Sequence, residues 1–125
     1  MDKTCYIDFD KTINQQNYPE IGKINEGCVL VLNQLRSLGY RLVLNTYRAD
    51  LNDGSLEAAT EFIKKNKIAL DGVESRKINP KPYDLEKDVL FLDDEAFGIP
   101  LKKSNTVLNL DVVDFGKIMA QIHQT

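Results

Sequence analysis

The sequence predicts an α/β domain built on a central parallel sheet. Three apolar runs, within residues 4–10, 41–46 and 88–94, have the length and composition of buried strands. Apolar residues recur at helical spacing in residues 23–38, and a second helical pattern follows the second run. Strands that alternate with helices favour right-handed crossovers, and such crossovers place the strands parallel in one sheet.

Length and composition are those of one globular domain covering residues 1–125. Charged residues make up 28% and hydrophobic residues 42% of the chain, and the net charge of −3 argues against a broad basic surface for nucleic acid. No run approaches the roughly 18 apolar residues of a membrane span, and no signal peptide precedes the first strand, so we expect a cytoplasmic protein. Cys5 and Cys28 are expected to be buried hydrophobes and not a disulfide or metal pair.

The first half of the chain has clear element limits. Residues 13–22 are polar and are expected to form a loop or short hairpin beside the first strand tip. The helix expected in residues 23–38 stops at Gly39, because glycine readily adopts the left-handed conformation that ends helices. Residues 47–54 are expected to be a loop, and a capped helix follows it through residue 63.

The second half of the chain gives weaker signals. A short third strand is expected in residues 68–70 or 72–75. The irregular segment after it contains two prolines, which exclude a continuous helix there. After the run that ends at residue 94, residues 106–110 are expected to form the fifth strand and residues 111–121 the closing helix.

Three of the expected strands end in polar residues. These residues are Asp8 and Asp10, then Asn45 and Thr46, then Asp93 and Asp94. Parallel strands bring such tips to one edge of the sheet, which is where α/β folds bind ligands. Several carboxylates cannot share a small site without a cation, and oxygen ligands suit Mg²⁺. The Thr46 hydroxyl, with Lys81 or Lys77, would supply donors for a substrate phosphate.

The chain resembles the haloacid dehalogenase superfamily, in particular its small capless members. Four motifs occur in the order of that superfamily, at residues 7–12, 42–46, 81–82 and 90–94. Two further features resemble the capless members, namely Thr46-Tyr47-Arg48 after the second strand and the Gly98-Ile99-Pro100 turn. The sequence departs from the first motif at Lys11, where the family usually has glycine, and the third-motif lysine is either Lys81 or Lys77.

The resemblance implies a fold, a reaction and a set of site residues. The implied fold is a Rossmann-like three-layer sandwich without a cap domain, whose parallel five-stranded sheet has the order 5-4-1-2-3. The implied reaction is Mg²⁺-dependent hydrolysis of a phosphomonoester through an aspartyl-phosphate on Asp8. Asp10 would be the general acid and base, and we expect anionic neighbours to favour its protonated form. Mg²⁺ would be held by Asp8, the backbone carbonyl of Asp10, and Asp93 or Asp94, and the substrate phosphate would bind Thr46, Lys81 and Arg48.

Capless members leave their site open, so the implied substrate is a large phosphorylated molecule, unless a neighbouring subunit of a homo-oligomer covers the site. Two alternatives stay open. A non-catalytic relative would bind phosphate and Mg²⁺ without turnover. A receiver-type signalling domain would need its phosphate-accepting aspartate at the end of the third strand, where only Asp71 is available.

Overall fold

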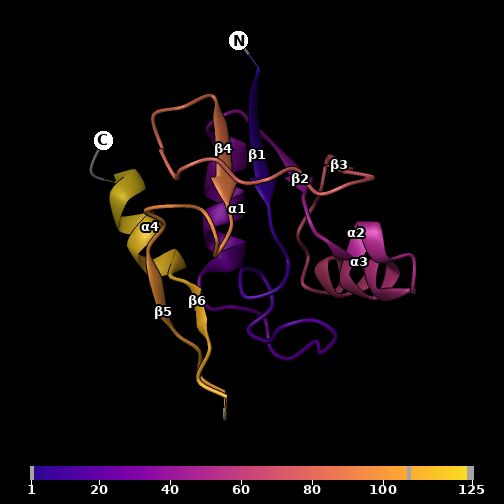
Figure 1. Cartoon of the computed structure of the whole chain (residues 1–125). Helices are drawn as coiled ribbons and strands as arrows, with labels where there is room; N and C mark the ends of the chain where they lie inside the picture. Colours follow the sequence, from indigo (N-terminus) through magenta and orange to yellow (C-terminus); the bar gives the residue numbers. More distant parts are fainter. Residues whose placement is uncertain (1, 107, 124–125) are drawn as a thin grey trace.

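The computed structural model describes residues 2–106 and 108–123, which form an α/β structure with six strands and four helices. The helices are α1 (Cys28–Ser37), α2 (Arg48–Leu51), α3 (Ser55–Lys65) and α4 (Phe115–His123). The strands are β1 (Lys3–Ile7), β2 (Tyr40–Leu44), β3 (Gly72–Val73), β4 (Val89–Leu92), β5 (Leu101–Lys103) and β6 (Asp111–Val113) (Figure 1).

A four-stranded parallel sheet in the order β3-β2-β1-β4 forms the centre of the fold. The three long strands of this sheet end in register, because Ile7 at the end of β1 pairs with Leu44 of β2 on one side and with Leu92 of β4 on the other. The backbone continues this register beyond the strands, since Asp8 N–H donates to the Leu92 carbonyl at 2.9 Å. The segments that follow β1, β2 and β4 therefore leave from the same edge of the sheet (Figure 1).

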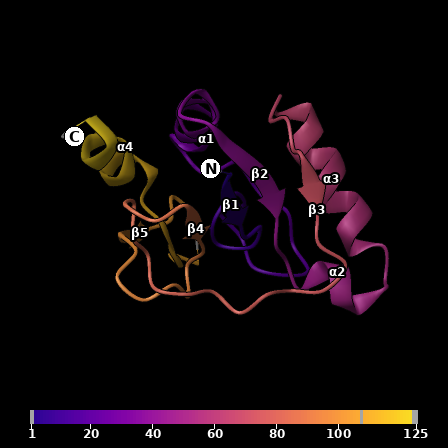
Figure 2. The same cartoon turned by 90° about the horizontal axis from the view of Figure 1, so that it is seen from above.

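The two faces of the sheet have different covers. Helices α1 and α4 lie side by side over one face, and the irregular segment 74–88 crosses the other (Figure 2). Strand residues alternate between the faces, so Ile7 is buried in the core on the helical side while the Tyr6 ring stacks on Phe91 on the opposite side. The core includes Cys5, Ile7, Leu32, Leu35, Leu44, Leu92, Phe115 and Ile118.

The C-terminal part differs from the sequence prediction. Within the described residues no strand covers 106–110, and Val107 lies outside the described residues. Instead β5 and β6 pair antiparallel as a separate two-stranded sheet, with Leu101 opposite Val113. The expected five-stranded order is thus not seen, and the closing helix starts at Phe115 instead of residue 111 because residues 111–113 form β6.

Cys5 and Cys28 are free and fully buried, and this burial raises the pKa of both thiols, as expected for cysteines that serve as small apolar side chains. None of the described helices combines the length and apolar character needed to span a membrane.

Candidate functional site

Three carboxylates meet at the edge of the sheet where β1 and β4 end. Asp8 follows β1 directly, and Asp93 and Asp94 follow β4, so the register between the two strands sets them opposite one another. One oxygen from each of the three side chains lies within 4.8 Å of the other two. Asp8 and Asp93 are buried, with 5% and 1% of their surfaces exposed. The structure thus brings together two acidic motifs that are more than eighty residues apart in the chain.

Lys77 is the cation that faces this carboxylate cluster. Its Nζ lies 3.1 Å from Asp8 Oδ1 and 3.0 Å from Asp93 Oδ2, and only 3% of its side chain is exposed. The backbone around it is held by Asn45, whose side-chain amide donates to the Ile78 carbonyl and accepts from the Ile78 N–H, both at 2.8 Å. Lys77 N–H also donates to Asp50 Oδ2 at 3.0 Å. Asn45 therefore positions Lys77 without touching the carboxylates itself.

Lys81, the preferred lysine of the sequence analysis, does not reach the cluster. It is exposed and lines a different pocket, together with Pro82, Asp84 and Lys87. The reason is the pair of hydrogen bonds between the Asn45 side chain and the Ile78 backbone. These bonds hold the segment so that Lys77 faces the acids, and the chain then continues away from them. Of the two lysines left open by the sequence, the structure places Lys77 at the site.

Thr12 and Lys11 contact the acids that follow β1 and β4. The sequence analysis gave neither residue a role at the site. The buried Thr12 hydroxyl donates to Asp8 Oδ2 at 3.4 Å and accepts from the Asp94 N–H at 3.2 Å. Lys11 occupies a left-handed conformation with φ of 61°, and its Nζ lies 3.4 Å from Asp94 Oδ2. The conformation explains why a glycine is expected at this position, and the ion pair shows what the lysine contributes there.

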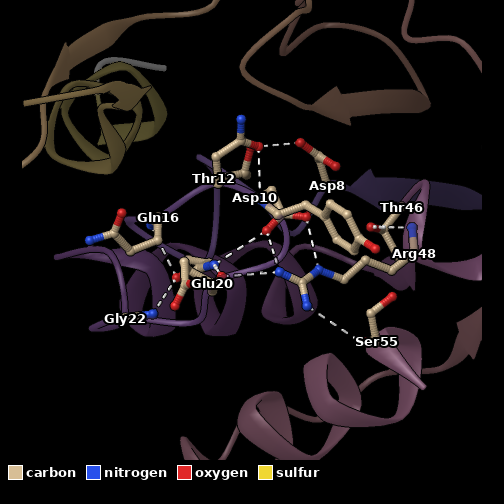
Figure 3. Close-up of polar contacts among 12 residues, drawn as sticks. Asp8, Asp10, Thr12, Gln16, Glu20, Gly22, Thr46, Arg48 and Ser55 are labelled. Carbon is tan, nitrogen blue, oxygen red and sulfur yellow. Dashed lines mark hydrogen bonds and ion pairs between the residues drawn. The ribbon is translucent and has the colours of Figure 1, made fainter. Parts of the chain in front are cut away.

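Asp10 forms a bidentate ion pair with Arg48 (Figure 3) and is not one of the three carboxylates of the cluster. Arg48 Nε donates to Asp10 Oδ2 at 2.9 Å, and Nη2 donates to Oδ1 at 2.7 Å. Asn14 Nδ2 donates to the same Oδ1 at 3.3 Å. The sequence analysis expected anionic neighbours around Asp10 and did not foresee that the Arg48 cation lies against both of its carboxylate oxygens.

Arg48 is 2% exposed, and its guanidinium is already engaged on several sides. It donates to the Glu20 carbonyl at 3.1 Å, and its Cζ lies 4.9 Å from the centroid of the Phe9 ring. Thr46, the third residue expected to bind phosphate, lines the same open pocket as Asp8, and its hydroxyl accepts from the Arg48 N–H at 3.2 Å. Arg48 is thus placed to hold Asp10, while Thr46 is placed beside it at the pocket wall.

Burial dominates the electrostatics of the carboxylate cluster. It raises the pKa of Asp8 well above its ordinary value, the neighbouring Asp93 raises it further, and Lys77 offsets part of this. Burial likewise raises the pKa of Asp94. Burial alone would lower the pKa of Lys77, but the carboxylates of Asp8 and Asp93 outweigh it and raise this pKa. The cluster therefore favours bound positive charge.

The donor set fits a divalent cation with oxygen ligands. Asp93 Oδ2 is buried and accepts no hydrogen bond from the described residues, although it faces Lys77 Nζ as an ion pair. Three carboxylates facing two lysines, Lys77 and Lys11, leave one excess negative charge when all are ionised, which Mg²⁺ would offset. Asp8, Asp93 and Asp94 are the residues that would hold the ion. The Asp10 carboxylate is bound to Arg48, so a contribution of Asp10 to the ion would come from its backbone carbonyl.

No protein-family model matches the chain, and no curated protein matches it. Among solved structures it is similar to a conserved protein from Bacteroides thetaiotaomicron, with a TM-score of 0.60 and 24% sequence identity. The similarity covers 99% of this chain and 92% of that protein. This likeness shows the fold alone. It agrees with the α/β architecture described above and carries no information on activity.

Proposed function

We propose that this chain is a capless phosphatase of the haloacid dehalogenase type, which hydrolyses a phosphomonoester with the help of Mg²⁺. The observation that carries the proposal is the meeting of Asp8, Asp93 and Asp94 within 4.8 Å at the carboxyl edge of a parallel sheet, with Lys77 beside them. The sheet order β4-β1-β2-β3 agrees with four of the five positions of the order 5-4-1-2-3 in that superfamily.

In this proposal Asp8 is the nucleophile. A carboxylate oxygen of Asp8 forms a bond to phosphorus while the bond from phosphorus to the leaving oxygen breaks, and Asp10 gives its proton to that oxygen. Asp10 then takes a proton from water, which attacks the aspartyl-phosphate, releases inorganic phosphate and restores the Asp8 carboxylate. In this structure Arg48 holds both oxygens of the Asp10 carboxylate. One of these two hydrogen bonds must therefore open when Asp10 carries the proton that it gives to the leaving oxygen.

Charge neutralisation is the physical requirement for this reaction. Two like unit charges at 4 Å repel by about 4 kcal/mol at an effective dielectric constant of 20, so a phosphate cannot approach the Asp8 carboxylate unaided. Lys77, which lies 3.1 Å from Asp8 and is almost fully buried, offsets part of this repulsion. Bound Mg²⁺ would supply the remaining positive charge and stabilise the phosphoryl oxygens.

The test is hydrolysis of p-nitrophenyl phosphate with Mg²⁺, with EDTA, and by the Asp8→Asn variant. We expect Mg²⁺-dependent release of p-nitrophenol that Asp8→Asn abolishes. Asp111→Asn is the matched control, because the Asp111 carboxylate is exposed and forms an ion pair with Lys103 of the neighbouring strand β5. Full activity of Asp8→Asn would contradict the proposal. Absence of activity on a broad phosphoester panel would favour the non-catalytic alternative.

A further inference from the structure

Two tyrosine rings and a leucine stand at the mouth of the pocket that contains the acids. Tyr18, Tyr47 and Leu51 line this pocket of about 210 Å³ together with Asp8 and Asp10. These three apolar side chains are 41%, 52% and 45% exposed, respectively. The pocket therefore has a charged floor and an aromatic rim, which we define as Tyr18, Tyr47 and Leu51.

Each ring of the aromatic rim lies against a cation of the site itself. Lys77 Nζ is 4.6 Å from the centroid of the Tyr47 ring, and Arg48 Cζ is 5.3 Å from that of Tyr18. The Tyr18 hydroxyl also donates to Asp53. These contacts fix the rings before a ligand arrives, so a ligand that stacks on them loses little of its binding free energy to side-chain ordering.

The rim also places the rings close to the reacting acids. Lys77 contacts both the Tyr47 ring and Asp8, and Arg48 contacts both the Tyr18 ring and Asp10. A phosphate bound beside the acids would consequently leave its alcohol part in the same pocket as these rings. Exposed aromatic side chains around a polar pocket favour a ligand with a planar apolar group.

We propose that the substrate is a phosphomonoester whose alcohol part carries a planar ring, such as a nucleoside base or an aryl group, and that Tyr18 and Tyr47 select it by stacking. This inference rests on the proposed phosphatase function. Stacking of one base on an aromatic side chain changes affinity by about tenfold or more. Ring-bearing substrates should be preferred over ring-free substrates by at least about that factor.

The kinetic test compares kcat/KM for adenosine 5′-monophosphate and phenyl phosphate with that for ribose 5-phosphate, in the presence of Mg²⁺. We expect ribose 5-phosphate to be the poorest of the three, and we expect Tyr47→Leu to reduce the preference for a ring about tenfold. Tyr47→Phe keeps the ring and should keep the preference. The relative rates with the two ring-bearing esters show whether the ring belongs to the base of a nucleotide or to an aryl leaving group.

A binding measurement separates failure of this inference from failure of the proposed function. The Asp8→Asn variant, which cannot form the aspartyl-phosphate, is titrated calorimetrically with adenosine 5′-monophosphate and with ribose 5-phosphate. Tighter binding of the nucleotide by about tenfold or more, lost on adding Tyr47→Leu but not Tyr47→Phe, supports the inference even if no ester is hydrolysed. Equal affinities, or no measurable binding of either ligand, would overturn it even if the protein is a phosphatase.

Discussion

Arg48 and Asp10 form a two-point ion pair, at 2.7 and 2.9 Å, that joins the end of the β1 segment to the first turn of α2. The side chain of Arg48 is 1% exposed and that of Asp10 is 14% exposed, so both charges are largely removed from water. The ion pair therefore links two parts of the fold and also holds the side chain of Asp10, the proposed general acid and base. Its loss would leave one buried charge without a partner.

Replacing Arg48 by alanine should lower the free energy of unfolding by about 3–5 kcal/mol, because the Asp10 carboxylate then stays buried and uncompensated. Chemical unfolding in urea measures this change. The additional change Asp10→Asn should recover part of the loss, because it removes the uncompensated charge. Lys103→Ala breaks an exposed ion pair with Asp111 and should cost less than about 1 kcal/mol. Equal effects of Arg48→Ala and Lys103→Ala would show that the bidentate pair contributes no special stability.

The raised pKa of Asp8 predicts how pH affects the metal-free protein. The folded protein holds this proton more tightly than the unfolded chain, whose aspartates titrate near pH 4, so ionisation of Asp8 destabilises the folded state as pH rises above that value. With EDTA present, wild type should lose stability relative to Asp8→Asn between pH 5 and pH 8, as measured by urea unfolding at both values. A difference between the two proteins that does not change with pH would contradict the prediction.

Asn45 should matter for the site although it does not touch the carboxylates. Asn45→Ala removes two hydrogen bonds to the Ile78 backbone, each of which contributes about 0.5–1.5 kcal/mol, so the change should cost about 1–3 kcal/mol of stability. It should also release Lys77 from Asp8 and reduce phosphatase activity. Asn66→Ala is a control, because Asn66 donates a comparable bond to the Phe62 carbonyl far from the site. Loss of stability in both variants with equal activity would show that Asn45 has no positioning role.

The parts of the site that follow from strand register could be predicted from the sequence. Asp8 and Asp93 are brought together because the strands before them are parallel neighbours that end at the same level, and alternation along the strand decides the face. The parts that depend on irregular backbone could not be predicted. Lys77 reaches the acids through hydrogen bonds between Asn45 and Ile78, and no periodicity in the sequence reports such a contact.

The same distinction explains where the fold predicted from the sequence was wrong. The β5–β6 hairpin consists of two three-residue strands, which are too short for the alternation that identifies a strand. Residues 111–113 fit either the start of an apolar helix or a short strand, and their pairing with residues 101–103 decides the outcome. Asp10 illustrates a further limit, because its partner Arg48 lies in the one-turn helix α2, in a segment where the sequence analysis expected a loop.

The most direct test of the account is a calorimetric titration of the metal-free protein with Mg²⁺ near pH 8, where loss of the cluster's protons is favoured. We predict saturable binding that Asp93→Asn abolishes or weakens strongly, whereas the exposed-site control Asp111→Asn binds as wild type does. Mg²⁺ binding that is absent from wild type, or that is the same in all three proteins, would contradict the claim that Asp8, Asp93 and Asp94 form a metal centre.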